Sequence, residues 1–485
     1  MKKFSFFASV LLASAALTTS CVDTDNPVIE EPKTVIELDG QQYETDLVAT
    51  LLGEEGKEIS LTIGVCDRYD IYGVDFGDGN IVADTVCFEN GGLRGEDGAE
   101  VEGTSHTSAT VFKGTVAGDG IIKIYGNSDI WMLAVSGNAL PASFREGMEK
   151  KVQNIQLTGV VVDGLDFSNM TGLTQLSVTN SPISSIDVSG NAELKSLSII
   201  CTSISEYEPQ LKSIDLSGNP KLETLTLGSA FYKQGQLTSI DLSQNTALQN
   251  IVIGYNKLTS ITLPAGAEVT QLSLEKNELT ELDLSVLGSL KNIQVNDNQL
   301  KSLDLSKMVE GSSINVNVSN NQLEELSIPV VVRALEAQNN QLKSVSIVDA
   351  TYSCKLENNQ LTLATLPTKP EGLNTTAKAR RFTYAPQAPL KVDEEVAELD
   401  LSAQLTAQGI LEAPATTAYI FFTASGTALA EGTDYQVVAP GKFKFIKAQA
   451  EKVYGVMANE GFPLFSGDDA FKTTEFTVKA AATAE

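Results

Sequence analysis

Apolar and polar residues alternate in a fixed block that recurs along the middle of the chain. One copy runs from Val269 to Leu284 and the next from Leu290 to Leu305; with aliphatic exchanges allowed, both read LxxLxLxxNxLxxLDL. Alternation at Leu272 and Leu274 places both side chains on one face of a short strand. The block covers about residues 152–361 with a basic period of 21 residues. It predicts a stack of about ten coils, each made of two short extended segments.

An asparagine follows the first alternating stretch in most copies. We expect its amide to satisfy backbone groups where the chain turns inward, because a buried turn otherwise leaves them unpaired. The predicted structural asparagines are Asn256, Asn277, Asn298, Asn321, Asn340 and Asn359. Earlier copies have Ser181, Thr202 and Ala230 in this slot, and a degenerate first copy has Val160.

The repeated block resembles the leucine-rich-repeat family. The resemblance implies a solenoid whose coils bury one continuous apolar column, in which no single repeat is stable alone. It also implies an extended surface suited to binding other proteins.

Short alternating stretches on both sides of the repeats predict further β structure. We expect a β-sandwich domain at residues 35–150, the solenoid at 151–365, a linker at 366–390 that contains four prolines, and a C-terminal domain at 391–485. Residues 74–80 resemble the DFGDG turn of polycystic-kidney-disease-type domains, and the C-terminal segment resembles immunoglobulin-like modules. The expected fold class is therefore mainly β: a leucine-rich-repeat solenoid with a small β-sandwich at each end.

The N-terminus is typical of an exported lipoprotein. Lys2 and Lys3 precede an apolar run that is too short to span a bilayer, and Ser20 precedes Cys21. These features resemble a lipoprotein signal peptide at 1–20, with Cys21 acylated and an acidic tether at 21–34. Acidic residues after the cysteine resemble the export signal of certain Gram-negative surface lipoproteins. The resemblance implies a lipid anchor in the outer membrane, exposed to the extracellular side.

Charge and composition argue against several functions. The chain has 34 basic and 62 acidic residues, a net charge of −28, which disfavours binding to nucleic acid and electrostatic docking on anionic membranes. His106 is the only histidine, no CxxC pair occurs, and no serine lies in a GxSxG motif. Five aspartates occupy one slot of the repeat, which argues for architecture: Asp187, Asp215, Asp241, Asp283 and Asp304. We expect no enzymatic activity, no cofactor and no bound metal.

Two alternatives concern the N-terminal segment. Carboxylates between residues 75 and 97 could hold Ca²⁺, although they lack EF-hand spacing; they are Asp75, Asp78, Asp84, Glu96 and Asp97. Cys66 and Cys87 could form a disulfide bond in an oxidising compartment.

Two surfaces of the solenoid are candidate binding sites. The outward slots of the first strand are polar and nearly free of aromatic residues; the candidates are Gln294, Asn296, Asn315, Asn317 and Glu336. The second surface is a ledge, residues 205–209 and 231–235, where slot spacings of 28 and 26 residues replace the period of 21. Insertions of this kind form loops on one edge of a solenoid, often the binding edge. The ledge carries Tyr207, Phe231 and Tyr232.

The leading functional hypothesis is a cell-surface module that binds an extracellular or cell-surface protein. The alternatives are a glycan-binding accessory of a nutrient-uptake system and a scaffold that only spaces envelope proteins. Scarce outward aromatic residues count against glycan binding. The strand face could also be merely solvated, and the ledge aromatics could fold back onto the coil.

Overall fold

The computed structural model describes residues 33–65, 69–87, 110–202, 207–229, 233–308, 313–371, 373 and 381–479. The chain forms two compact units, residues 1–267 and 268–485. Both units are built from β-strands; helix within the described residues is limited to single 3-10 turns, η1 (Met148–Lys150), η2 (Ser402–Gln404) and η3 (Gly467–Asp469).

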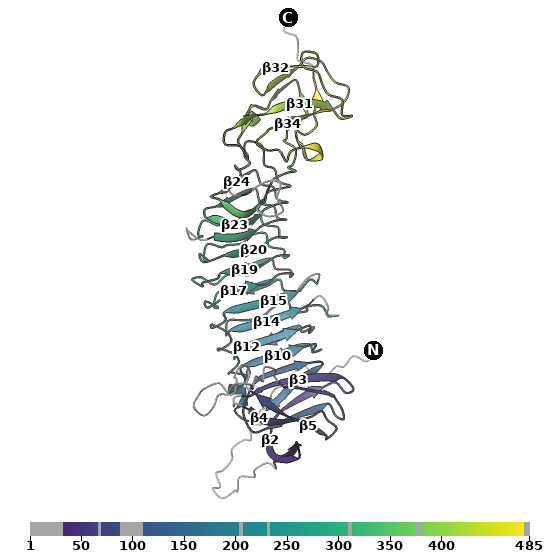
Figure 1. The fold of residues 1–485 in the computed structure, drawn as a ribbon, viewed down its shortest axis with the longest axis vertical. Helices are drawn as coiled ribbons and strands as arrows, with labels where there is room; N and C mark the ends of the chain where they lie inside the picture. Colours follow the sequence, from purple (N-terminus) through teal and green to yellow (C-terminus); the bar gives the residue numbers. More distant parts are fainter. Residues whose placement is uncertain are drawn as a thin grey trace. The chain divides into compact units, whose positions relative to one another are not determined.

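The first unit begins with two sheets (Figure 1). Their strands are β1 (Thr34–Leu38), β2 (Gln41–Gly53), β3 (Glu58–Val65), β4 (Tyr69–Asp75), β5 (Ile81–Cys87), β6 (Val111–Thr115), β7 (Ile121–Gly126), β8 (Ile130–Ser136) and β9 (Ala139–Phe144). One sheet has the order β1-β2-β7-β4-β5, with β9 also paired to β2. The other contains β6, β3 and β8, and β8 pairs in parallel with the first solenoid strand. The N-terminal strands thus supply a covering strand for the end of the solenoid.

The rest of the first unit consists of stacked solenoid coils. Their strands are β10 (Asn154–Thr158), β11 (Gly164–Asp166), β12 (Gln175–Thr179), β13 (Ser185–Asp187), β14 (Ser196–Cys201), β15 (Thr224–Ser229), β16 (Ser239–Asp241), β17 (Asn250–Val252) and β18 (Ser260–Thr262). The first strands of successive coils form a parallel sheet in the order β10-β12-β14-β15-β17. The second strands pair as β11 with β13 and β16 with β18.

The second unit continues the same coil pattern. Its solenoid strands are β19 (Gln271–Ser273), β20 (Asn292–Gln294), β21 (Ser313–Asn317), β22 (Glu325–Ile328), β23 (Val331–Glu336), β24 (Ser344–Ile347), β25 (Ala350–Lys355) and β26 (Arg381–Thr383). The parallel sheet has the order β19-β20-β21-β23-β25-β26, and β22 pairs with β24. The predicted solenoid of coils about 21 residues long is confirmed.

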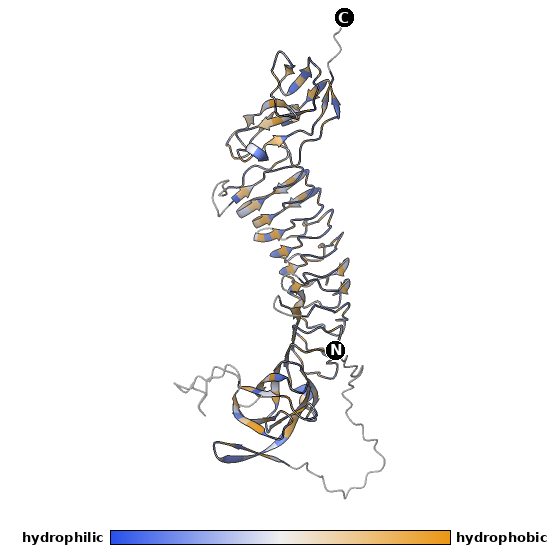
Figure 2. Ribbon diagram, turned by 90° about the vertical axis from the view of Figure 1, so that its right-hand side faces the viewer, coloured by the Kyte–Doolittle hydropathy of each residue, from blue (hydrophilic) through white to orange (hydrophobic). Residues whose placement is uncertain are grey.

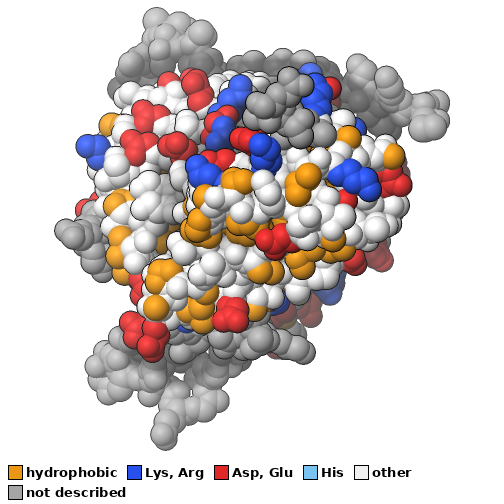
Figure 3. Space-filling view, turned by 90° about the horizontal axis from the view of Figure 1, so that it is seen from above, with side chains coloured by type: hydrophobic (Ala, Val, Ile, Leu, Met, Phe, Trp, Pro, Cys, Tyr) orange, Lys and Arg blue, Asp and Glu red, His pale blue; other side chains and the backbone are white. Residues whose placement is uncertain are grey.

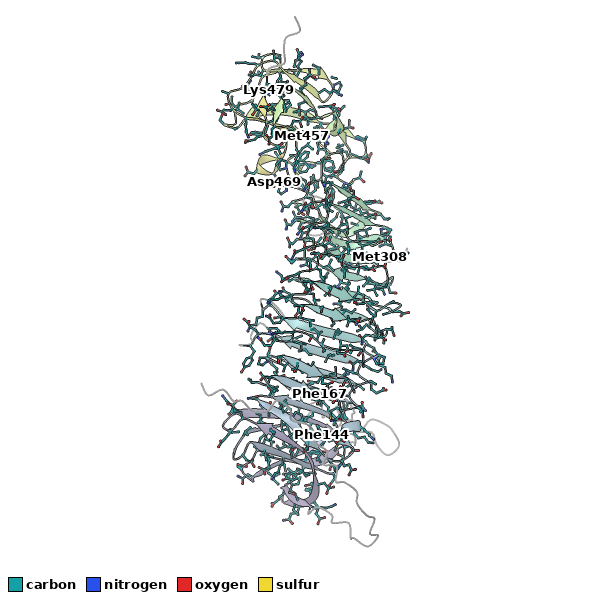
Figure 4. All side chains as sticks on the ribbon, turned by 180° about the vertical axis from the view of Figure 1, so that it is seen from behind. Phe144, Phe167, Met308, Met457, Asp469 and Lys479 are labelled. Atoms are coloured by element: carbon teal, nitrogen blue, oxygen red, sulfur yellow. The ribbon has the colours of Figure 1, made fainter. Side chains whose placement is uncertain are left out.

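Alternation along each coil builds the core, as predicted. Leu272, Leu274 and Leu279 have no solvent exposure, and Leu284 is 1% exposed. Hydrophobic and hydrophilic residues alternate along the solenoid strands in Figure 2. Side chains such as Phe167 in the first unit and Met308 in the second, both labelled in Figure 4, are buried. Stacked aliphatic side chains therefore remove each coil's apolar surface from water, which is the main stabilising contribution in such folds.

The segment predicted as a linker, residues 366–390, contains a further coil. β26 pairs in parallel with β25, placing Phe382 opposite Cys354, and both side chains are fully buried. Gln387 occupies the asparagine slot: it accepts a 3.1 Å bond from the Leu361 N–H and donates to the Leu356 carbonyl at 2.7 Å. The prediction missed this coil because Phe382 and Gln387 replace the expected aliphatic residue and asparagine.

The remaining strands form small sheets. They are β27 (Glu395–Val396), β28 (Glu398–Asp400), β29 (Thr406–Ala407), β30 (Ala415–Thr416), β31 (Ala418–Thr423), β32 (Tyr435–Ala439), β33 (Lys442–Phe445), β34 (Val453–Ala458), β35 (Phe471–Lys472) and β36 (Thr477–Val478). Their orders are β28-β33-β32, β31-β34-β35, β27-β36 and β29-β30. Tyr384 of the last coil packs edge-on against Phe462 and Phe465, with ring centroids 5.1 and 5.2 Å away. This cluster covers the apolar end of the last coil.

Candidate functional site: the outer faces of the solenoid

A ladder of buried asparagines fixes the turn after each first strand in the second unit. Asn298 donates to the carbonyls of Leu274, at 2.9 Å, and Val295, at 3.1 Å, and accepts from the Leu279 N–H at 3.0 Å. Asn321, Asn340 and Asn359 repeat the same donor and acceptor pattern. The asparagine side chains thus hydrogen-bond to backbone N–H and carbonyl groups of the turn, and because they are buried they are not available to a binding partner.

The residue before each ladder asparagine has a left-handed backbone. Its φ lies between 55° and 59° at Tyr255, Lys276, Asp297, Asn320, Asn339 and Asn358, and Asn180, before the Ser181 slot, has a φ of 53°. This conformation costs least for glycine, asparagine and aspartate, which explains the Asn-Asn pairs of the later coils. The turn projects the first residue of each pair outward while the second points inward.

These outward residues form a second, exposed amide ladder. The Asn320 amide donates to Asp297 at 2.9 Å, Asn339 donates to Asn320 at 2.7 Å, and Asn358 donates to Asn339 at 2.8 Å. Asn296 donates to the other carboxylate oxygen of Asp297 at 2.6 Å. Because each amide is held by its neighbours, the row presents ordered polar groups to solvent.

A further asparagine ladder in the first unit was not predicted. Asn191, Asn219 and Asn245 are fully buried in the second half of their coils; Asn191 follows β13 and Asn245 follows β16. Asn219 donates to the carbonyls of Val188 and Asn191, both at 3.0 Å, and Asn245 donates to those of Leu216 and Asn219, both at 2.9 Å. The recurring sequence DLSxN, with valine in place of leucine before Asn191, carried this signal.

The recurring aspartates shape the turns, as their register predicted. Each carboxylate accepts the N–H of the serine two residues later; in the Asp304–Ser306 pair the distance is 2.8 Å. This bond and the serine hydroxyl hold the pKa of Asp304 below its usual range, and the pKa values of the other four are lowered in the same way.

The predicted strand-face residues lie outward on neighbouring strands of the second unit or, for Asn296, just after β20. Gln294, Asn296, Asn315, Asn317 and Glu336 are half-buried. Asn292 pairs with Asn315 in register, and Gln294 with Asn317, so the side chains form columns across the coils. Glu336 forms a 2.6 Å ion pair with Lys355 of the next coil. The strands thus gather these side chains into one continuous polar face.

Two residues that the slot pattern overlooked interrupt this polar face. Register shifts place Arg333 between Val332 and Ala334 of β23 as an extra residue, and in β25 two residues, Thr351 and Tyr352, lie opposite it. The Arg333 guanidinium lies 5.7 Å from the centroid of the Tyr352 ring. Bulges turn side chains out of the regular alternation, and therefore a strict repeat pattern misses them.

The ledge is only partly described. Tyr207 is half-buried, whereas Phe231 and Tyr232 lie outside the described residues. The Lys233 ammonium donates to the Tyr207 carbonyl at 2.8 Å, so the two inserted segments contact each other. Beneath them lies a cavity of about 20 Å³, lined by Cys201, Pro209 and Leu211 among others. That volume is enough for one water molecule.

The candidate calcium ligands serve the backbone where they are described. Asp75 accepts the N–H groups of Gly77 and Gly79 at 2.8 and 3.0 Å, and Asp78 accepts that of Asn80 at 2.9 Å. Glu96 and Asp97 lie outside the described residues, as do Cys21, Cys66 and His106. Within the described part of the chain, no group of three or more His, Cys, Asp or Glu side chains is placed to hold a metal. No helix in that part is long and apolar enough to cross a membrane.

No protein-family profile matches the chain, and no curated protein matches it in sequence. Similar solved structures include the leucine-rich repeat domain of APL1B, with 20% identity over 49% of this chain and 76% of that chain and a TM-score of 0.35. Another is the functional domain of InlJ from Listeria monocytogenes, with 16% identity over 73% of this chain and 93% of that chain and a TM-score of 0.27. Because the sequence identities and TM-scores are this low, the fold assignment rests on the geometry of the repeats in this chain and not on these two structures.

Proposed function

We propose that the protein is a binding protein whose solenoid recognises another protein through the strand face of its second unit. The observation that carries the proposal is the exposed amide ladder at Asp297, Asn320, Asn339 and Asn358, next to the columns of Asn and Gln side chains. These groups are already ordered, so a partner that bonds to them loses less side-chain entropy on binding. The backbone amides and carbonyls of the coils are engaged in the stack, which leaves side chains to make the contacts.

The test is a binding screen of the purified full chain against parallel panels of extracellular proteins and glycans. Each hit is repeated with Gln294→Arg and Asn315→Arg, which place two long cations on the strand face. The matched control is Ser344→Arg and Ser346→Arg on β24, which belongs to the other strand layer of the coil. A protein hit that is lost in the strand-face variant and retained in the control supports the proposal. Protein hits whose binding is unchanged in both variants contradict the proposal.

The location of this activity is the second part of the proposal. The lipobox-like sequence ending at Cys21 and the acidic tether support a lipid-anchored protein on the outer face of the outer membrane. Metabolic labelling with a radioactive fatty acid tests the anchor: label should be incorporated in the natural chain and absent after Cys21→Ala. Protease treatment of intact cells tests the orientation, since an inward-facing protein would survive it.

Glycan binding is a second candidate, favoured by one observation in the C-terminal segment. Phe422 and Tyr454 stack on neighbouring strands β31 and β34 with centroids 5.8 Å apart, and Ile420 beside them is 48% exposed. In Figure 3, hydrophobic side chains share the visible surface with acidic and basic ones. Half-exposed rings of this kind suit sugar stacking. Glycan binding that is abolished by Tyr454→Ala and retained in the strand-face variant would favour glycan binding over protein binding as the function.

A further inference from the structure

The second unit carries a basic aromatic patch that stands out from its acidic surroundings. It consists of Arg333 on β23, Tyr352 on β25 and Arg381 on β26, three consecutive strands of the parallel sheet. All three side chains are exposed, and Tyr352 is 50% exposed. We call this set the basic bulge.

Backbone geometry explains why these side chains meet. The extra residues in β23 and β25 fall at matching places in the two strands, because Val332 pairs with Ala350 and Ala334 with Ser353. Arg381 pairs with Ser353, the residue that follows Tyr352. Two adjacent bulges and the next strand therefore aim three side chains at one part of the surface. Matched bulges of this kind re-aim side chains without ending the sheet.

The Arg333–Tyr352 contact orders both side chains. At 5.7 Å from the ring centroid, the guanidinium is within the range of a cation–π interaction. An ordered arginine keeps its donors in a fixed fork, which matches the geometry of a carboxylate. Neither Arg333 nor Arg381 forms an ion pair with an acidic side chain in the part of the chain that the structure describes.

The charges around the bulge favour an anionic partner. On the same face, Lys355 is neutralised by Glu336 at 2.6 Å. Asp349, at the start of the turn into β25, accepts the N–H of Ala350 through one oxygen at 2.7 Å. With Asp349 still anionic, the two arginines leave one excess positive charge at this patch, on a chain whose net charge is −28.

We infer that the basic bulge is the anchor point for an acidic protein segment, one that places an Asp or Glu side chain on Arg333 and an apolar side chain beside Tyr352. Val348, in the turn between β24 and β25, is 63% exposed. Tyrosine and arginine are the residue types that most often dominate binding energy in protein interfaces. This inference rests on the proposed protein-binding function and names the chemistry of the partner.

The test is selection of a displayed library of 12-residue peptides on the purified full chain. Enriched peptides should carry an excess of Asp and Glu, and replacing those residues by Asn and Gln should weaken binding about tenfold or more. Arg333→Ala and Tyr352→Ala should each cause a similar loss, and Arg333→Lys a partial one, because lysine keeps the charge without the planar fork. Tyr352→Phe should bind normally. Binding should also weaken as salt is raised.

The control is Lys343→Ala, which removes one cation from the β24 side of the coil, where Lys343 pairs with Glu324. Peptides without an acidic excess, or peptides insensitive to Arg333→Ala, would overturn the inference. If binding of these peptides is abolished by Gln294→Arg and Asn315→Arg, the proposed protein-binding function is retained and only the role of the basic bulge is refuted. Binding of acidic glycans with no acidic peptides selected would also overturn it. Thermal melting of each variant verifies folding, which exposed side chains should not alter.

Discussion

Leu279 donates its backbone N–H to the side-chain oxygen of Asn298, 3.0 Å away in the next coil. The side-chain NH₂ of Asn298 donates to the carbonyl of Leu274, 2.9 Å away in the coil that precedes Asn298. One buried side chain thus completes the backbone of its own turn and of its neighbour. Since the contact recurs from coil to coil, the stack is stabilised as a series of neighbour interactions.

Replacing Asn298 by alanine should therefore destabilise the second unit. The change leaves the Leu279 N–H buried without a partner, at about 1–3 kcal/mol, whereas the Leu274 carbonyl keeps its 3.0 Å bond from the Asn277 amide. We expect a total loss of about 1–3 kcal/mol, measured by urea denaturation. Asn320→Gly is the matched control, because its amide lies in the exposed ladder and glycine tolerates the φ of 57° at this position, and it should cost less than about 1 kcal/mol. Equal losses in the two variants would contradict the assignment of distinct roles.

Tyr384 should be critical for the end of the solenoid. Its ring is fully buried against Phe462 and Phe465, and burial raises the pKa of its hydroxyl to about 12. Tyr384→Ala should destabilise the second unit by about 3–5 kcal/mol. Tyr384→Phe removes only the acceptor of the Leu464 N–H, at 3.0 Å, and should cost about 1–2 kcal/mol. Similar denaturation midpoints for Tyr384→Ala and the natural chain would show that the cluster does not cap the coils.

Acid should weaken the coils through their recurring aspartates. The pKa of Asp304 is lowered in the folded state, mainly by the Ser306 N–H, so its stabilising contribution is present above the unfolded pKa of about 3.9. That contribution is lost as the pH falls through the lower folded value. Asp304→Asn keeps an acceptor oxygen but binds no proton there. Its stability should therefore fall less steeply below pH 4 than that of the natural chain, as measured by denaturation midpoints across pH. Parallel curves for the two proteins would refute this linkage.

Cys201 and Cys354 should resist alkylation in the folded protein. Their side chains are 2% and 0% exposed, and burial raises the pKa of both thiols, so the reactive thiolate is scarce. Iodoacetamide at pH 8 should label their peptides only after denaturation, as read by mass spectrometry. If Cys354 is alkylated as fast in the native protein as in the denatured protein, the last coils must open readily.

Much of the solenoid could be predicted from one chain because its physics is local and repeated. The alternation at Leu272 and Leu274, the Asn298 slot and the Asp304 turn each satisfy needs that arise within one coil or between adjacent coils. A residue type repeated at a fixed period therefore reveals its role without knowledge of distant contacts.

The candidate binding surfaces were less predictable. The strand-face residues follow from alternation, and the structure places Gln294 and Asn315 on one face as expected. Arg333 and Tyr352 could not be found in this way, because bulges break the alternation that the prediction used. Phe231 and Tyr232 lie outside the described residues, so the ledge stays a prediction.

The sequence by itself determined the repeat, its period, its buried columns and its turn-forming Asp and Asn, because each depends on neighbours at a fixed spacing. Only the tertiary structure decided that β8 covers the first coil and that Phe382, Tyr384 and Gln387 complete the last one. Those contacts join segments outside the repeat, where no period constrains which side chain fills the available space. Packing between such segments depends on shape in three dimensions, which the spacing of residues along the chain does not encode.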